Sequence, residues 1–299
     1  MAEMNLVITL DKNYLQHAAV MLRSLLATNA ANKCTLFVIC DERINTADWN
    51  KLEEVYKNSS LQVVKINIDP NLFKGFKLSE HATYANYYRI ELANLIPKNI
   101  NKLLYLDVDI VVNQDLAELY ATDIGNYFLA AVEDPIVPQK VKLGLNQNEP
   151  YFNSGVMLIN LEAWRNAELN KKLAAFIIEN PDKISFWDQD AFNALCIGKW
   201  KPLLPKFNFQ SVFFTLKNGA LTYNYTNVKE GMQQPVIIHY TGMSKPWKYM
   251  DRHPRKSDYY KFLKETPWKD YQPDDKSFAN RIRKYGFMPG FMEQILKRK

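Results

Sequence analysis

An aspartate pair inside an apolar run is the first feature whose residue types and spacing point to chemistry. Asp107 and Asp109 stand two positions apart in the run LLYLDVDIVV at 103–112. Side chains at i and i+2 of a β-strand point to one face, so the two like charges would repel there, in an element that disfavours Asp. A hard divalent cation would compensate them and keep positions open for phosphate oxygens. The alternative is that the strand has ended and both aspartates are solvated turn residues.

A histidine at the end of a second apolar run is the next candidate. His239 lies in VIIHY at 236–240 and precedes TGMSKPW at 241–247. An imidazole that leaves a strand end is well placed to ligate a metal. Gly242 would allow a close backbone approach to a ligand, and Lys245 offers a point charge for phosphate. The alternative is a core histidine whose hydrogen bonds are satisfied within a loop.

Glycine and cysteine usage narrows the kinds of site. The chain has 299 residues but only 10 glycines, from which no G-x-G-x-x-G or Walker loop can be assembled. A phosphate cradle of the dinucleotide or P-loop type is therefore disfavoured. The three cysteines have no metal-ligand spacing and indicate a reducing compartment without a disulfide framework.

Alternating strands and helices would position these residues. Strands are expected at 5–10, 35–40, 61–68, 103–112, 155–161 and 236–240. Helices are expected at 14–28, 46–58, 83–95, 162–179 and 188–197. This alternation predicts an α/β fold, Rossmann-like, with a mostly parallel central sheet and flanking helices.

The C-terminal fifth of the chain has a different character. Strand signals stop near residue 250, and short helices are expected at 257–264, 277–285 and 291–298. Residues 245–299 hold 15 Lys and Arg against 7 Asp and Glu, although the whole chain carries only +6. We therefore expect a main domain at 1–250 and a small basic, aromatic helical tail at 251–299. The tail suits docking on an anionic membrane, where each nearby cation contributes about 1 kcal/mol; the alternative is a solvated tail packed on the body.

Three classes of segment or function are disfavoured. The N-terminal residues lack a charged start followed by an apolar stretch, so no signal peptide is expected. No run of 18 or more apolar residues predicts a membrane span. The candidate motifs lie in the slightly acidic body and not on a basic groove-reading element, which argues against nucleic acid as a partner.

Six segments together resemble the glycosyltransferases of family 8. In chain order they are TLDKNY at 9–14, YYR at 87–89, LYLDVD at 104–109, YFNSGV at 151–156, WDQD at 187–190 and HYTGMSKPW at 239–247. Each segment alone is weak, but jointly and in this order they are specific. The resemblance covers about residues 5–250 and is to the bacterial branch that adds galactose or glucose to lipopolysaccharide-type acceptors.

This resemblance implies a GT-A fold for a catalytic domain at 1–250. It implies a hexosyltransferase that uses UDP-galactose or UDP-glucose with Mn²⁺, or Mg²⁺ as the alternative, and that retains the anomeric configuration. The implied acceptor is a lipid-linked oligosaccharide, as in lipopolysaccharide or lipooligosaccharide, or another cell-surface glycan. The implied location is cytoplasmic and peripheral, on the inner face of the cytoplasmic membrane.

The resemblance also assigns residues by position. The metal ligands would be Asp107, Asp109 and His239. The donor-binding set, from uridine through diphosphate to sugar, would be Thr9, Leu10, Asp11, Asn13, Arg89, Asp107, Val108, Asp109, Asn153, Asp188, Gln189, Gly242 and Lys245. The weaker matches His81 and Asp134 would lie near donor and acceptor contacts.

Gln189 and Asp188 are the expected catalytic residues. An oxocarbenium-like centre needs partial negative charge near the anomeric carbon, and the Gln189 carbonyl oxygen would lie on the β face of the sugar. Because an amide is a poor covalent nucleophile, we favour front-face attack by the acceptor hydroxyl, with the leaving phosphate oxygen as base. The metal and Lys245 would replace the missing glycine loop as the cradle of the diphosphate.

Plainer alternatives stand beside these assignments. They are Arg89 paired with Glu91 or Asp11, Asn153 as a turn residue, Asp188 as a helix N-cap, and Asp134 as a turn residue beside Pro135. For the whole protein, the alternatives are a self-glucosylating, glycogenin-like enzyme and a sugar-nucleotide-binding module without catalysis. The basic tail and short length fit the first alternative less well, and the intact candidate motifs disfavour the second.

Overall fold

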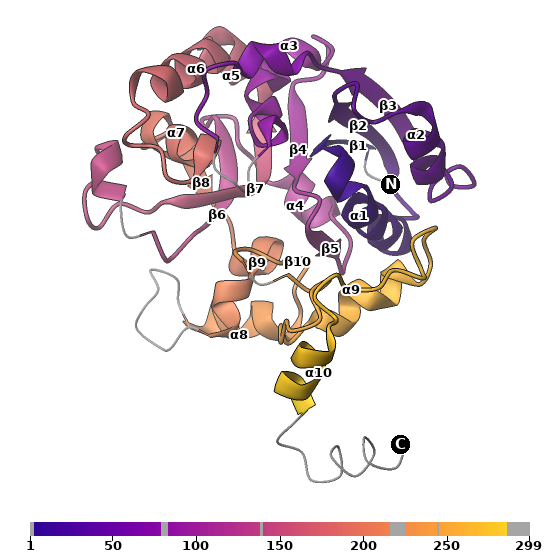
Figure 1. Cartoon of the computed structure of the whole chain (residues 1–299). Coiled ribbons are helices and arrows are strands. Elements are labelled where there is room, and N and C mark those ends of the chain that lie inside the picture. Colours follow the sequence, from indigo (N-terminus) through magenta and orange to yellow (C-terminus); the bar gives the residue numbers. More distant parts are fainter. Residues whose placement is uncertain (1–2, 79–82, 138–139, 216–224, 244, 286–299) are drawn as a thin grey trace, which may run out of the picture.

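A seven-stranded mixed sheet forms the centre of the protein (Figure 1). The computed structural model describes residues 3–78, 83–137, 140–215, 225–243 and 245–285. The strands lie in the order β3-β2-β1-β4-β7-β6-β8. Their bounds are β1 Glu3–Leu10, β2 Lys33–Cys40, β3 Gln62–Asn67, β4 Lys102–Leu106, β6 Leu129–Glu133, β7 Phe152–Asn160 and β8 Trp200–Pro202. Within this sheet β7 is antiparallel to both neighbours and the other pairs are parallel, so the expected mostly parallel α/β fold is confirmed.

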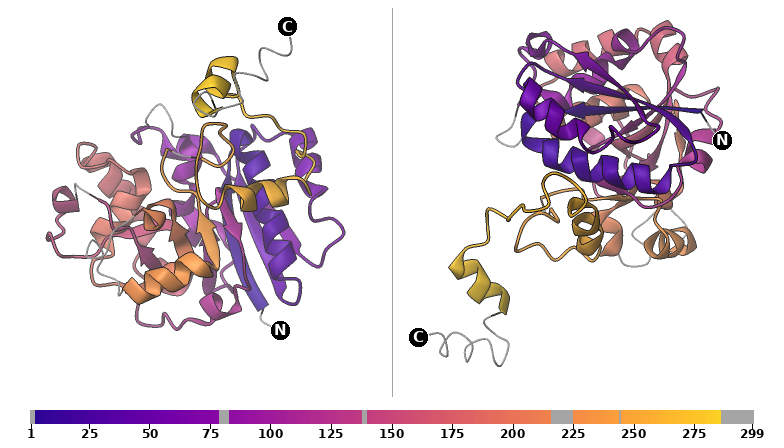
Figure 2. Two further views of the ribbon diagram at one scale, coloured as in Figure 1. Left: turned by 90° about the horizontal axis from the view of Figure 1, so that it is seen from below. Right: turned by 90° about the vertical axis from the view of Figure 1, so that its right-hand side faces the viewer.

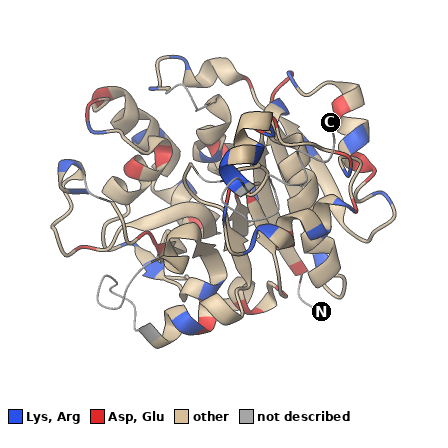
Figure 3. Cartoon of the chain, turned by 60° about the horizontal axis from the view of Figure 1, so that its bottom comes forward, with Lys and Arg blue, Asp and Glu red and all other residues tan. Residues whose placement is uncertain are grey.

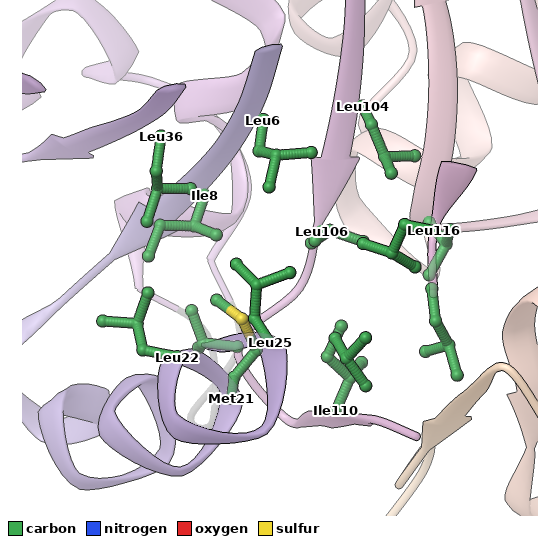
Figure 4. Packing of buried hydrophobic residues seen from close by; sticks show 14 of the residues in the cluster. Leu6, Ile8, Met21, Leu22, Leu25, Leu36, Leu104, Leu106, Ile110 and Leu116 are labelled. Carbon is green, nitrogen blue, oxygen red and sulfur yellow. The ribbon is translucent and has the colours of Figure 1, made fainter. Parts of the chain in front are cut away.

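Helices cover both faces of this sheet (Figure 2). On one side lie α1 Leu15–Thr28, α2 Thr46–Glu53 and α4 Ala117–Ala121, and on the other α3 Leu92–Leu95, α5 Leu161–Asn166, α6 Leu169–Glu179 and α7 Trp187–Leu195. Alternation along β1 divides the core: Leu6 and Ile8 pack toward α1, whereas Val7 packs in the opposite layer. Figure 4 shows Met21, Leu22 and Leu25 of α1 beneath the strand residues Leu6, Ile8 and Leu36.

The run expected as one strand at 103–112 is two strands in different sheets, which corrects the sequence interpretation. β4 ends at Leu106, the chain bends through 107–109, and β5 runs Ile110–Val112. A second, three-stranded sheet has the order β5-β10-β9, with β10 Ile237–His239 and β9 Phe209–Gln210. The aspartates therefore lie at the bend between two sheets, where their carboxylates are not forced into adjacent sites on one strand face.

Other expected elements differ in continuity. The helix expected at 83–95 is a series of short turns, with 3-10 helices at Tyr84–Asn86 and Tyr88–Glu91 before α3. The helix expected at 162–179 breaks between α5 and α6, where Glu168 adopts a φ of 49°. The strands β6, β8 and β9 and the helices α4 and α8 (Tyr225–Gln233) were not predicted.

The C-terminal segment divides into a packed and a projecting part. Helix α9 (Lys256–Leu263) packs on α1, and Tyr259, Phe262 and Leu263 are buried against Tyr240 and Trp247. Helix α10 (Phe278–Tyr285) projects from the body (Figures 1 and 2). The helix expected at 291–298 lies outside the described residues. This packing joins α9 to the main body, so the projecting segment begins beyond the expected boundary at residue 250.

Two features of the structure relate to the expected membrane partner: the distribution of basic residues and the length and apolar character of the helices. Lys and Arg are spread over the body as well as the C-terminal segment (Figure 3). Among the described residues, no helix combines the length and the apolar character that crossing a bilayer requires.

Candidate active site

The candidate residues meet where β1 and β4 end. These strands are adjacent and parallel. The strands that follow β1 in the chain, β2 and β3, lie on one side of the pair, whereas β6, β7 and β8, which follow β4, lie on the other. Such a reversal of strand order leaves a crevice beyond the carboxyl ends of the strands. Because β7 is antiparallel to β4, its first residues reach the same edge, and the Asp107 amide donates to the Gly155 carbonyl at 2.7 Å.

Asp107, Asp109 and His239 converge at this edge. One ligand atom from each lies within 4.8 Å of the others. His239 Nε2 is 3.2 Å from Asp109 Oδ1 and 3.7 Å from Asp107 Oδ2. The small sheet causes this approach, since β10 pairs with β5 and the Tyr240 amide donates to the Asp109 carbonyl at 3.1 Å. The strand ends before both aspartates, as the alternative expected, but their partly buried carboxylates contact Arg89, Lys245 and His239 and are not simply solvated.

Gly155 lies directly against the side chains of His239 and Asp107. A Cβ at Gly155 would lie 2.2 Å from His239 Cε1 and 2.5 Å from Asp107 Oδ2. The glycine is therefore required by the close approach of these two side chains. Two carboxylates and one imidazole form a donor set that suits a divalent metal. The residues present thus fit the metal that the cluster implies.

Two buried or half-buried cations flank the aspartates. Lys245 Nζ lies 2.6 Å from Asp109 Oδ2 and donates to the Tyr240 carbonyl at 2.7 Å. Arg89 Nη1 donates to Asp107 Oδ1 at 3.1 Å and to the Ser154 carbonyl at 2.8 Å. Burial would raise the pKa of Asp109, but Lys245 and His239 outweigh it and hold that pKa well below its usual value. The carboxylates of Asp107, Asp109 and Asp188 thus offset the two cations, and a bound divalent metal would supply the further positive charge that a diphosphate requires.

Asp188 is the second partner of Arg89. Its Oδ2 lies 2.5 Å from Arg89 Nε, and the carboxylate is 1% exposed. Arg89 thus pairs with Asp107 and Asp188, and neither expected alternative partner, Glu91 or Asp11, is needed to explain its burial. Burial raises the pKa of Asp188 to about 6 in spite of the opposing charge of Arg89.

The start of α7 holds Asp188 and Gln189 in a strained geometry. Trp187, which precedes them, has a φ of 49°, an uncommon value that persists where the surroundings enforce it. Asp190 accepts from the amides of Ser185 and Phe186 at 2.6 Å each. Asp190, and not Asp188, therefore accepts hydrogen bonds from the backbone amides that precede this helix, so the N-cap alternative for Asp188 is wrong.

The expected sugar contacts form a hydrogen-bonded group. Gln189 Oε1 accepts from the Ser154 amide at 3.0 Å and from Asn153 Nδ2 at 3.3 Å, and Gln189 Nε2 donates to Asp134 at 3.5 Å. Burial raises the pKa of the half-buried Asp134. The placement of the Gln189 carbonyl against a sugar stays a prediction, because that oxygen is bonded to this protein's own groups here.

The expected uridine contacts lie at the end of β1. Thr9 Oγ1 is 3.0 Å from the Tyr105 hydroxyl, which in turn donates to Asp107 at 2.8 Å. Asp11 accepts from the Asn13 amide at 2.7 Å and from the Thr83 hydroxyl at 2.6 Å. Asn13 is exposed, whereas the side chains of Leu10 and Val108 are buried. His81 lies outside the described residues.

Gly242 and Trp247 stand on either side of Lys245 in the sequence, and Trp247 is held by residues outside the predicted motifs. Gly242 has a φ of +78°, in the region that favours glycine. The Trp247 ring stacks on His17 with 3.6 Å between centroids, and His17 Nδ1 lies 2.7 Å from the Tyr259 hydroxyl. Sequence reasoning missed His17 and Tyr259, because nothing local links α1 or α9 to the Lys245 segment.

Asn208 was also missed. It is fully buried, and its Oδ1 lies 2.9 Å from His239 Nδ1, while its Nδ2 donates to Asn153 at 2.9 Å. The residue belongs to a 3-10 helix, Pro205–Asn208, far from every motif in the sequence. No sequence signal points to it.

Comparison with known proteins places the chain in a family. Residues 5–251 match the model of glycosyl transferase family 8. The chain is 32% identical to general stress protein A of Bacillus subtilis over 270 residues, covering 89% of this chain and 94% of that protein. It is 26% identical to a lipopolysaccharide 1,2-glucosyltransferase of Escherichia coli K12 over 289 residues, covering 94% of this chain and 84% of that enzyme.

A solved structure agrees in fold. The galactosyltransferase LgtC, crystallised with donor and acceptor sugar analogues, superposes with a TM-score of 0.80 at 25% identity, covering 91% of this chain and 98% of LgtC. The expected GT-A fold and the expected enzyme class are thereby confirmed. The chain belongs to glycosyltransferase family 8.

Proposed function

We propose that this glycosyltransferase moves galactose or glucose from a UDP-sugar to a glycan with retention of configuration, using Mn²⁺. The observation that carries the proposal is the convergence of Asp107, Asp109 and His239 beside Lys245 and Arg89 at the sheet edge. Carboxylate and imidazole ligands with adjacent cations suit a metal-bound diphosphate. The similar proteins include one named for glucosyl transfer and one named for galactosyl transfer, so the proposal keeps both UDP-glucose and UDP-galactose as donors.

The proposed donor site divides into three parts. Asp107, Asp109 and His239 would hold the metal, which supplies Lewis-acid stabilisation of the charge that builds on departing UDP. Lys245 would exchange its contact with Asp109 for a phosphate oxygen, because its ammonium is the nearby cation on a flexible stem. Thr9, Asp11 and Asn13 would orient the uridine at the end of β1, as their positions in the motif imply.

The surroundings of Asp188 and Gln189 support front-face transfer. Asp188 is buried in an ion pair with Arg89, so its carboxylate is poorly placed to attack an anomeric carbon. The Gln189 amide is a weak nucleophile whose oxygen is held by Ser154 and Asn153. We therefore propose that the acceptor hydroxyl attacks from the side of the leaving phosphate, whose oxygen takes the proton. A glycosyl adduct trapped on either side chain during turnover would contradict this course.

UDP release tests the proposed donor and metal. The protein is incubated with a panel of UDP-sugars in Mn²⁺, in Mg²⁺ or in EDTA, and free UDP is measured. We expect slow, metal-dependent hydrolysis of UDP-galactose or UDP-glucose, and no release in EDTA. The variant Asp109→Asn should lose this activity and remain folded with a lowered melting temperature, because it keeps the side-chain volume but removes the ion pair with Lys245. Release that persists in EDTA, or wild-type turnover by Asp109→Asn, would refute the metal assignment.

We propose an anionic membrane surface as the partner of α10, which would place the enzyme beside a lipid-linked acceptor on the inner face of the cytoplasmic membrane. Phe278 and Ile282 lie four positions apart and are 66% and 40% exposed. Arg281 and Arg283 are exposed on the same helix. An amphipathic helix with basic and large apolar residues suits the interface of an anionic bilayer.

Vesicle sedimentation tests this partner. Full-length protein is compared with protein ending at residue 277, a cut that keeps α9 on the body and removes α10. We expect the full-length chain to sediment with anionic vesicles and not with neutral ones, and the shortened chain to stay in solution with unchanged UDP release. Equal sedimentation of the two chains would refute the proposal.

A further inference from the structure

We propose that Asn208 is a positioning residue that fixes the tautomer and ring orientation of His239, so that Nε2 is the ring nitrogen available to a metal held between the aspartates. The inference deepens the proposed function, since it rests on a metal bound by His239. The side-chain hydrogen bonds of Asn208 go to the far side of the His239 ring and to Asn153. Asn208 is 0% exposed, so water does not compete for these contacts.

The direction of the hydrogen bonds follows from a backbone donor. The Gly155 amide can only donate, and it lies 3.1 Å from Asn153 Oδ1, which must therefore be the carbonyl oxygen. A second backbone donor, the Ser154 amide, fixes Gln189 Oε1 as an acceptor at 3.0 Å. The Asn153 amide group then donates to Gln189 at 3.3 Å, in agreement with the first assignment. Backbone geometry thus determines which way Asn153 faces.

The orientation of Asn153 fixes the orientation of the Asn208 amide, which in turn decides which ring nitrogen of His239 carries the proton. Its Nδ2 faces the Asn153 carbonyl oxygen at 2.9 Å, so its own Oδ1 faces His239 Nδ1 at 2.9 Å. An oxygen acceptor requires a proton on Nδ1. Nε2 lies toward Asp109 and Asp107, so it donates to Asp109 when the ring is cationic and carries the lone pair for a metal when the ring is neutral. A partner that holds the second ring nitrogen in this way orients a metal-binding histidine and raises its basicity.

The opposite tautomer would break this chain of contacts. Nδ1 without a proton would face the Asn208 oxygen, leaving two acceptors together in a buried site. Nε2 with a proton would turn a donor toward the carboxylates and remove the ligand. The side chains from β7, the 3-10 helix and β10 therefore have one mutually consistent arrangement in which the imidazole can bind a metal.

Metal affinity tests the role of Asn208 apart from turnover. Mn²⁺ binding is measured by calorimetry, with and without UDP, for Asn208→Leu and Asn208→Asp. The leucine has similar size but no acceptor, and we expect its Mn²⁺ affinity to fall about 10- to 100-fold. The aspartate still accepts from Nδ1, so we expect affinity close to that of the wild type, with lower stability because it cannot donate to Asn153. Equal loss in both variants, or no loss in the leucine variant, would overturn the proposal.

Asn29→Leu is the matched control. Asn29 is also buried, at 4% exposure, and accepts from the Leu116 amide far from the candidate site. Its replacement should lower the melting temperature without changing Mn²⁺ affinity. A wild-type protein that binds no Mn²⁺ would instead contradict the proposed function, whereas intact binding that ignores Asn208→Leu contradicts only this inference.

The tautomer itself is measurable in the wild-type protein, which keeps the test open if Asn208→Leu does not fold. The chain has four histidines, so ¹⁵N-histidine labelling gives few signals, and a His239→Gln variant assigns the one of interest. In the complex with Mg²⁺ and UDP at pH 8.5, we expect a proton on Nδ1 and none on Nε2. A proton on Nε2 in that complex would overturn the proposal.

Discussion

Replacing Gly155 with alanine probes the closeness of the metal-site residues directly. The added Cβ would lie 2.2 Å from His239 Cε1 and 2.5 Å from Asp107 Oδ2. Non-bonded carbon atoms prefer a separation of about 3.5–4.0 Å, so the ring or the strand must shift by more than about 1 Å. Neither group moves freely, because His239 is 3% exposed and Gly155 lies inside β7.

The size of the effect follows from this displacement. Overpacking of a tight site costs about 1–3 kcal/mol of folding stability. A misplacement of about 1 Å at a catalytic group costs about 100-fold in rate, or roughly 2.7 kcal/mol of transition-state stabilisation. We therefore expect Gly155→Ala to remain folded with a lowered melting temperature, to bind Mn²⁺ more weakly and to release UDP about 100-fold more slowly.

Gly125→Ala provides the control for a glycine-to-alanine change. Gly125 is exposed, and a Cβ there would meet only Asp123 Oδ1 at an ordinary 3.4 Å. UDP release, Mn²⁺ calorimetry and thermal melting are compared for both variants and the wild type. If Gly155→Ala binds Mn²⁺ and turns over like Gly125→Ala, His239 and Asp107 do not meet over this glycine, and the metal site must lie elsewhere.

Three further predictions concern groups around the site. Arg89→Met should lower the free energy of unfolding, measured in urea melts, by about 3–5 kcal/mol, because it leaves the buried Asp188 unpaired. Adding Asp188→Asn to the same chain should recover part of this loss. A double variant that keeps the full loss would show that the two residues are not coupled. Burial lowers the pKa of His17 to about 3 from about 6.5, so as pH falls the unfolded chain binds a proton at His17 before the folded chain does. The free energy of unfolding should therefore decrease as pH drops from about 6.5 toward 3. An equally steep decrease in His17→Gln would contradict this. Tyr259→Phe removes a hydroxyl that is hydrogen-bonded to Gln16 and His17, which should lower the free energy of unfolding by about 1–3 kcal/mol. Because His17 stacks on Trp247, the change should also weaken UDP binding in a calorimetric titration. Unchanged UDP affinity would show that α9 does not support the segment carrying Lys245.

Much of the site was accessible from the sequence because its members sit in short local patterns. Asp107 and Asp109 stand out against apolar flanks, and His239 and Lys245 follow an apolar run that any strand prediction detects. The break between β4 and β5 was not accessible, because nothing in the apolar periodicity of 103–112 marks a change of sheet. Pairing with β10, far along the chain, decides where that run divides.

The sequence by itself determined the α/β class, the family and the residue types that could bind a metal and a diphosphate. These depend on local periodicity and on motifs read in order. Only the tertiary structure decided that Gly155 makes room for His239, that Asn208 holds the far side of its ring, and that α9 supports the segment carrying Lys245. Such contacts join residues distant in the chain, and their hydrogen-bond directions and close approaches exist only once the strands have taken their register.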